Sequence, residues 1–280
     1  YVTQGSAGKE TGTGGTVTFT ASIEYPAGVF TQITFGGSVT SPAIADLSQV
    51  VSDPVAVAIP ANTLYWVRVF GVFAAGLPFS TSPISNYDNT NGQRTNVSIG
   101  SISDQTMGGT VSNTSADLTW TPVAILGMTS AKAAFIISDS RSFAVGDTAP
   151  VNASKFRGEI EPSLAPSIGV INGGVAGTRA TTWAGNNNPN QLALIGYCTS
   201  VVGELGINDL NSGRTGAQAI ADHQTIAGLV GKPYFLTTAP PITTTPQNLA
   251  SKVLSRKIAT SAPISVMALA LLLSAPLSTL

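Results

Sequence analysis

The chain has little charge, one cysteine and one histidine. Of its 280 residues, 13 are Lys or Arg and 14 are Asp or Glu, so 10% are charged and the net charge is -1. Proteins that bind nucleic acid or an anionic membrane normally carry a basic patch, and this balance indicates none. Ordinary globular domains have about 25% charged residues. A surface built from hydroxyls and amides instead suits an extracellular, periplasmic or virion-associated protein.

The scarcity of Cys and His excludes several kinds of site. Cys198 is the single cysteine, so an intramolecular disulfide is excluded, and with only His223 beside it the usual zinc-ligand sets are excluded too. Because Cys198 lies in an apolar stretch, we expect a small buried hydrophobic residue. No P-loop pattern is present, and residues 169–177 are not followed by the acidic residue of a dinucleotide-binding loop. We therefore expect neither a metal nor an organic cofactor.

Both ends of the chain lack a recognisable membrane or targeting segment. The chain starts at Tyr1 without a methionine or an apolar signal core, which indicates a processed start or a fragment. Residues 258–280 carry no charge, and the apolar stretch Ile264–Leu273 is flanked by prolines. A spanning helix needs about 20 mostly apolar residues. Membrane insertion is therefore disfavoured against a packed or disordered tail.

The first part of the chain has the pattern of antiparallel strands. From residue 16 to about 73, apolar residues alternate with polar ones, as Val17, Phe19 and Ala21 alternate with three threonines. Turn signals rich in Pro, Gly and Asn separate the runs. Residues 76–115 are crowded with Ser, Asn, Gly and Pro and predict a long surface loop. Residues 1–120 therefore form a β-rich N-terminal region.

The second part, residues 121–246, alternates strands, loops and helices. Candidate helices cover 156–164, 178–194 and 215–230. Strands that alternate with helices imply an α/β domain with a parallel sheet covered on both faces. The tail, residues 247–280, has a different composition, without carboxylates and rich in Leu. A truncated or frame-shifted C-terminus would explain this change.

Polar residues gather after four short apolar runs of this second part. The four clusters are Ser138–Ser140, Asn172–Gly177, Glu204–Asp209 and Thr237–Pro241. In open α/β sheets ligands bind at the carboxyl ends of the strands, so such clusters indicate chemistry. A serine there could act as a nucleophile, with turn amides and an asparagine side chain stabilising an oxyanion. Each cluster alone is also compatible with an ordinary turn, and the glycines with a tight connection.

Taken together and in this order, the clusters resemble the SGNH (GDSL-like) hydrolase family of esterases and lipases. Ser138-Asp139-Ser140 is similar to its GDS block, Asn172–Gly177 to its glycine block, and Gly206-Ile207-Asn208-Asp209 to its GxND block. The resemblance implies a flavodoxin-like three-layer α/β/α sandwich without metal or cofactor. Residues 31–38 and 51–55 are also similar to the β-rich leader of some bacterial and phage members.

The resemblance assigns roles to particular residues. Ser140 would be the nucleophile, and the amides of Ser140 and Gly177 with the side chain of Asn208 would form the oxyanion hole, supported by Asp139 and Asp209. Two departures stand against it. Ser138 replaces the first glycine of the nucleophile block, and no Asp-x-x-His block follows: the chain has no Asp or Glu after Asp222 and no His after His223.

The missing block leaves the general base unknown. His223 falls inside the predicted helix 215–230, where we expect a solvent-facing or locally bonded residue and not a base for Ser140. The predicted function is a serine ester hydrolase, impaired by the missing histidine, that acts on an O-acylated small molecule or glycan, for example in deacetylation. The alternative is a non-catalytic carbohydrate-binding or virion or cell-surface structural protein. The oligomeric state is left open.

Overall fold

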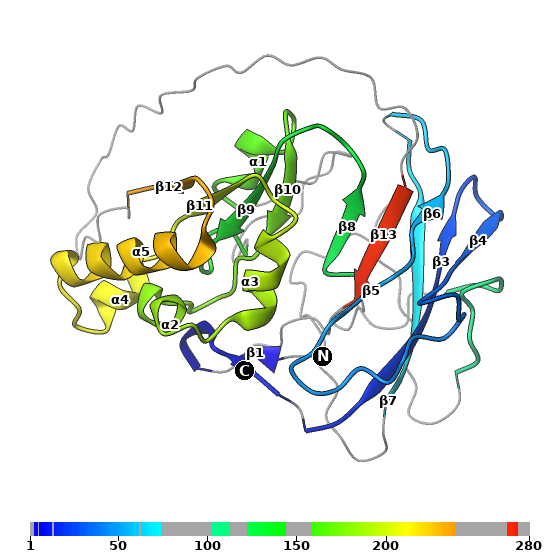
Figure 1. The fold of residues 1–280 in the computed structure, drawn as a ribbon, viewed down its shortest axis with the longest axis horizontal. Coiled ribbons are helices and arrows are strands. Elements are labelled where there is room, and N and C mark those ends of the chain that lie inside the picture. The colour runs from blue at the N-terminus through cyan, green and yellow to red at the C-terminus, as the bar shows by residue number, and fades with distance from the viewer. Residues whose placement is uncertain are drawn as a thin grey trace. The chain divides into compact units, whose positions relative to one another are not determined.

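The computed structural model describes residues 3–4, 6–12, 14–61, 63–73, 102–111, 122–143, 158–238 and 268–273 (Figure 1). The chain divides into two compact units. Among the described residues, the first unit holds those up to Ser130 together with 268–273, and the second holds 131–143 and 158–238. The protein is thus a mixed α/β structure with a β-rich unit and a unit built on a parallel sheet.

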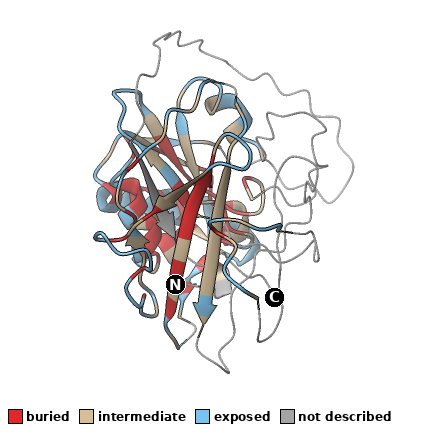
Figure 2. Cartoon of the chain, turned by 90° about the vertical axis from the view of Figure 1, so that its right-hand side faces the viewer, coloured by how far each residue is buried: buried red, intermediate tan, exposed pale blue. Residues whose placement is uncertain are grey.

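The first unit is built on antiparallel strands. Its central sheet has β3 (Val17–Glu24) between β4 (Phe30–Ile33) and β7 (Trp66–Phe73). In the first half of β3 alternate side chains enter the core, where Val17, Phe19 and Ala21 are almost fully buried. Figure 2 shows the buried residues in red on strands and helices. This burial explains the two-residue period of the sequence. On β7, Trp66 and Phe70 are half-buried.

Smaller strand groups complete the described part of the first unit. The strands β1 (Thr3–Gln4) and β2 (Glu10–Thr11) pair with each other, with the short 3-10 helix η1 (Ser6–Gly8) between them. Strand β13 (Ala268–Leu273) pairs antiparallel with β5 (Val50–Val51), β6 (Val55–Ala56) and β8 (Ala124–Gly127). The pairing of β8 places residues just beyond 120 in the first unit.

A short part of the predicted loop 76–115 is described. Residues 102–111 contain neither helix nor strand, and they are fastened to the central sheet by polar contacts. Arg68 forms an ion pair with Glu24 at 2.8 Å and donates to three carbonyl oxygens of this segment. Asp104 accepts from Thr20 Oγ1 at 2.5 Å. The rest of the loop lies outside the described residues.

The second unit contains a four-stranded parallel sheet. Its strand order is β10 (Gly169–Asn172), β9 (Ala133–Ile137), β11 (Ser200–Gly203), β12 (Tyr234–Leu236). These strands match the four apolar runs of the sequence. Residues 134–137 of β9 are almost fully buried because β9 has a neighbour on each side. All pairs are parallel, so the carboxyl ends of the strands meet at one edge.

Helices connect the parallel strands. They are α1 (Glu161–Leu164), α2 (Ala180–Ala184), α3 (Pro189–Ile195), α4 (Ile207–Asn211) and α5 (Gly216–Val230). The predicted helix 215–230 is α5, which begins at a Thr215–Gln218 capping box and ends at Gly231 in the left-handed conformation. The prediction of one helix over 178–194 is wrong. The chain breaks at Gly185 and Asn186, where Asn186 has φ 53°, and α3 restarts with Pro189 at its first turn.

The prediction that Cys198 is a small buried residue is confirmed. Cys198 is 2% exposed, and burial raises the pKa of its thiol to about 11, which disfavours the thiolate that a nucleophile requires. The helices in the described part of the chain are all too short or too polar to cross a membrane.

Candidate active site

Three of the predicted clusters, and Thr237 and Thr238 of the fourth, lie at the carboxyl edge of the parallel sheet, whereas residues 239–241 lie outside the described residues. Ser138 follows β9, Glu204 follows β11 and Asn172 ends β10. The strand order reverses between β9 and β11, because β10 lies on one side of β9 while β11 and β12 lie on the other. Ligand sites of open α/β sheets form at such switch points. The fold therefore brings residues about 70 positions apart in sequence to one edge.

The segment after β9, residues 138–143, is called the nucleophile loop after the role predicted for Ser140. It contains three serines with different surroundings. Ser138 and Ser142 are buried, and each donates a hydrogen bond of 2.5 Å to Oε2 of Glu204. Ser140 is half-buried, and its side chain makes no hydrogen bond with any described residue. Ser140 is therefore the serine of this loop whose hydroxyl is available for chemistry.

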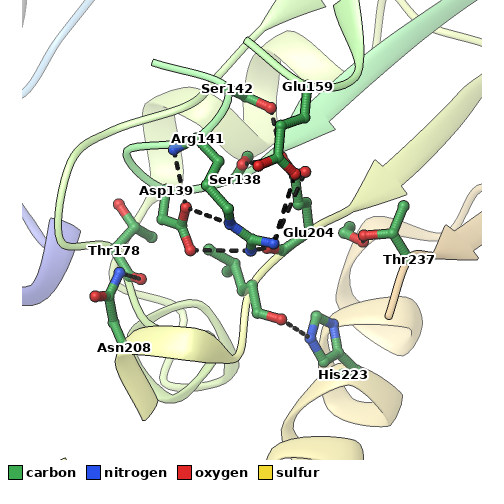
Figure 3. A network of polar contacts seen from close by, with 12 residues as sticks. Ser138, Asp139, Arg141, Ser142, Glu159, Thr178, Glu204, Asn208, His223 and Thr237 are labelled. Carbon is green, nitrogen blue, oxygen red and sulfur yellow. Dashed lines mark hydrogen bonds and ion pairs between the residues drawn. The ribbon is translucent and has the colours of Figure 1, made fainter. Parts of the chain in front are cut away.

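Asp139 and Arg141, which flank Ser140 in the sequence, form a buried ion pair. Figure 3 shows the two side chains facing each other. Arg141 Nε and Nη2 lie 3.0 and 3.1 Å from the two carboxylate oxygens of Asp139, and its backbone N–H also donates to Asp139. Burial works against the charge of Arg141, but the hydrogen bonds and charge of Asp139, with the charges of Glu204 and Glu159, outweigh it and raise its pKa. Arg141 stays charged and fixes the backbone around Ser140.

Glu204 joins the nucleophile loop to β11. Its side chain is 3% exposed, and Arg141 provides the nearby positive charge, with Nη1 3.9 Å from Glu204 Oε1 and Nη2 donating to the Glu204 carbonyl. Glu159 lies 4.0 Å from the same guanidinium. Partial burial, followed by the hydrogen bond and charge of Glu204, raises the pKa of Glu159. The guanidinium is thus the positive centre of three carboxylates.

The glycine block after β10 packs against the nucleophile loop. Asn172 Nδ2 donates to the Ser142 carbonyl at 2.9 Å, and Val175 N–H donates to the Ser138 carbonyl at 3.2 Å. A Cβ at Gly174 would lie 2.8 Å from Phe143 N, and one at Gly173 would lie 2.5 Å from the Phe135 ring. These two glycines are therefore required for close packing within the protein itself.

Three hydrogen-bond donors of the predicted oxyanion hole are uncommitted. The backbone N–H groups of Ser140 and Gly177 make no hydrogen bond with any described residue. Asn208 donates one of its two side-chain N–H bonds to the Thr178 carbonyl at 3.1 Å, which leaves the other N–H available (Figure 3). Gly177, with φ 79°, has a backbone that an L-residue adopts only with strain.

Asp209 orients helix α4, which carries Asn208. The Asp209 side chain is fully buried and accepts hydrogen bonds from Ala180 N–H at 2.8 Å and from Thr181 N–H at 3.1 Å. The Thr181 hydroxyl donates to it as well, at 2.7 Å. This links α4 to the first turn of α2, directly after Gly177 and Thr178. Asp139 and Asp209 thus fix the two loops from which the predicted site residues extend.

His223 is buried, so the expectation of a solvent-facing residue is wrong, whereas the alternative of a locally bonded residue describes it well. Its Nε2 lies 3.1 Å from the Leu205 carbonyl and its Nδ1 2.7 Å from the Tyr234 hydroxyl. A carbonyl can only accept, so Nε2 carries the proton and Nδ1 accepts from Tyr234. Burial lowers the pKa of His223 against the Leu205 hydrogen bond and nearby carboxylates. Both ring nitrogens thus have partners other than Ser140.

Glu204 and Arg141 are the residues to which the sequence pointed least clearly. Glu204 belongs to a predicted cluster and Arg141 directly follows another, but their pairing depends on side-chain geometry across 63 positions. One available signal was a carboxylate placed directly after a buried strand, where an unpaired charge would be costly. Among the described residues, no group of three or more His, Cys, Asp and Glu side chains is arranged to hold a metal ion.

Comparisons with known proteins find no relative of this chain. No family model, no curated protein and no solved structure matches the chain. The functional argument therefore rests on the residues and the geometry of the site.

Proposed function

We propose that this protein is a serine ester hydrolase of the SGNH type, with Ser140 as its nucleophile, acting on an O-acylated small molecule or glycan. The observation that carries the proposal is that the half-buried Ser140 and three donors without a partner among the described residues, on Ser140, Gly177 and Asn208, belong to connected segments at the carboxyl edge of one parallel sheet. The strand order supports it, because it equals the first four strands of the flavodoxin-like order, with the site at the switch point.

The proposed reaction is acyl transfer to Ser140 and then to water. Ser140 Oγ attacks the ester carbonyl carbon, and the three donors stabilise the negative charge of the tetrahedral intermediate. Collapse of the intermediate breaks the bond to the alcohol and leaves acyl-Ser140. Water then attacks this ester and releases the acid. The serine proton must pass to a base in the first step and to the leaving alcohol afterwards.

No general base is assigned to Ser140 in this proposal. His223 is the only histidine of the chain, and both of its ring nitrogens form hydrogen bonds, with the Leu205 carbonyl and the Tyr234 hydroxyl. Loss of the base of a catalytic triad costs about 10⁶ in rate, whereas an intact oxyanion hole retains about 10³ to 10⁴ over water. We therefore expect slow turnover, with activated esters such as a short-chain aryl acetate as the best substrates.

The proposal is tested by turnover of a short-chain aryl ester. Ser140→Ala is expected to abolish the turnover, and Asn208→Ala to lower it by about 10² to 10³ because one oxyanion donor is lost. Ser163→Ala, at an exposed serine of α1, is the matched control and should keep the parent rate. Turnover that survives in Ser140→Ala at the parent rate would exclude the mechanism.

The engagement of His223 also favours a second candidate, a non-catalytic protein that binds an acylated glycan at the same edge. Such a protein would bind the ester without hydrolysing it. Binding of an acetylated sugar, without turnover of it or of the aryl ester, would support this candidate against the hydrolase.

A further inference from the structure

One buried carboxylate contacts the nucleophile loop on both sides of Ser140. The same oxygen of Glu204, Oε2, accepts from Ser138 and from Ser142, each at 2.5 Å. All three side chains are at least 97% buried, so water does not compete for these hydrogen bonds. Hydrogen bonds to a charged acceptor are stronger than those between neutral groups. Ser140 is thus the middle of a five-residue segment held at both ends.

Glu204 also stands at the start of the segment that carries Asn208. It directly follows β11, and its backbone carbonyl accepts from Arg141 Nη2, next to Ser140 in the chain. The backbone N–H of Glu204 donates to the Ile137 carbonyl at 2.8 Å, at the end of β9. A shift of Glu204 would therefore move both the nucleophile loop and the segment that leads from β11 into α4 with Asn208.

Burying the carboxylate of Glu204 carries a desolvation penalty. Its desolvation is compensated by Arg141, by two hydroxyl groups and by the hydrogen bond with the carboxyl group of Glu159. Replacing such a buried charge and its partners by well-packed apolar side chains often leaves the stability of a protein unchanged or raises it. The arrangement makes physical sense where the relative placement of two loops matters more than stability.

We propose that Glu204 is a positioning residue, which sets the Ser140 hydroxyl against the oxyanion donors by holding Ser138 and Ser142. The inference rests on the proposed function for its catalytic meaning. Its structural part concerns the order of residues 138–143 and is measurable without any turnover. Glu204 does not touch the substrate in this proposal.

Amide hydrogen exchange of the nucleophile loop tests the structural part. The amides of Arg141 and Phe143 are the probes, because both donate to Asp139, at 3.1 Å each. Ser142→Ala removes one of the two hydrogen bonds to Glu204 and should speed exchange of both amides by about tenfold to a hundredfold. Glu204→Gln, whose amide oxygen still accepts hydrogen bonds, should give a smaller increase.

Ser22→Ala is the matched control. Ser22 is fully buried and donates a hydrogen bond of 2.5 Å to the Thr106 carbonyl. Ser22→Ala therefore removes a buried serine hydrogen bond of the same length, but in the first unit. Exchange of the Arg141 and Phe143 amides should stay at the parent rate in this variant. Unchanged exchange in Ser142→Ala, or an equal increase in Ser22→Ala, would overturn the inference.

Aryl ester kinetics test the catalytic part. Ser142→Ala should lower kcat by about tenfold or more with KM unchanged, because the misplaced hydroxyl weakens only the transition state. Faster exchange with an unchanged kcat would overturn the positioning role. If the parent protein has no turnover but Ser142→Ala still speeds amide exchange, Glu204 does hold the nucleophile loop. The proposed hydrolase function is then rejected instead.

Discussion

Two kinds of glycine occur in the loop after β10, and they serve different purposes. Gly173 and Gly174 have no room for a Cβ, because neighbouring atoms lie within 3 Å of where it would stand. Gly177 has open space around it but a φ of 79°. Its requirement is conformational, since the positive φ decides where its N–H points. A substitution at Gly177 therefore tests the direction of this N–H and not the packing.

Gly177→Ala is expected to lower the free energy of unfolding by about 1 to 2 kcal/mol, the cost of a left-handed conformation for an L-residue. It should also lower aryl ester turnover, because the strained loop shifts its N–H away from the oxyanion. Gly231→Ala is the control, since Gly231 has φ 58° and open space but ends α5.

Denaturant unfolding and ester kinetics of the two variants check this prediction. Equal losses of stability with a loss of turnover confined to Gly177→Ala are the expected result. Unchanged turnover in Gly177→Ala would remove Gly177 from the oxyanion hole.

At the scale of elements, α5 is tied to the loop after β11 by a histidine. His223 on α5 donates to the Leu205 carbonyl, one residue after Glu204, and accepts from Tyr234 of β12. Because burial lowers its pKa below the ordinary 6.5, the folded protein takes up a proton at His223 less readily than the unfolded chain. The neutral, hydrogen-bonded His223 therefore contributes its full stabilisation of the folded state above pH 6.5. This contribution is lost as the pH falls below 6.5, because the unfolded chain then binds a proton at His223 more readily than the folded protein.

His223→Gln tests how much His223 contributes to the pH dependence of the free energy of unfolding. The glutamine amide can donate and accept as the neutral imidazole does but does not titrate, so the fall in unfolding free energy between pH 7 and pH 5 should be smaller than in the parent protein. The carboxylates around His223, Asp209 and Asp222, are common to both proteins, so the difference isolates the imidazole. Denaturant unfolding at several pH values measures it, and identical pH profiles would contradict the account.

The elements themselves were predictable where one local signal decides them. The four parallel strands follow from short apolar runs, and α5 follows from the cap at Thr215 and the stop at Gly231. The break between α2 and α3 was missed although the sequence carries a local signal for it, because Gly185, a run of three asparagines and Pro189 separate the two helices.

At the scale of the whole molecule, the meeting of distant segments at one edge follows from a parallel sheet. The ion pairs and hydrogen bonds of Glu204, Arg141 and Asp139 do not follow from it, because they depend on which side chains meet across adjacent loops. The burial of His223 was missed for the same reason, since α5 shows its buried face only once it packs. The pairing of β8 with β13 is likewise a long-range contact without a local signal.

The central claim is that Ser140 accepts an acyl group at this edge. Without a free histidine the second step, attack of water on acyl-Ser140, should be slow, so the intermediate should accumulate. The most direct measurement is mass spectrometry of the intact protein and its peptides after incubation with an aryl acetate. We predict one acetyl group per chain, located on Ser140 and absent in Ser140→Ala. Acetylation that is equal in both proteins, or that spreads over surface lysines with none on Ser140, would contradict the account.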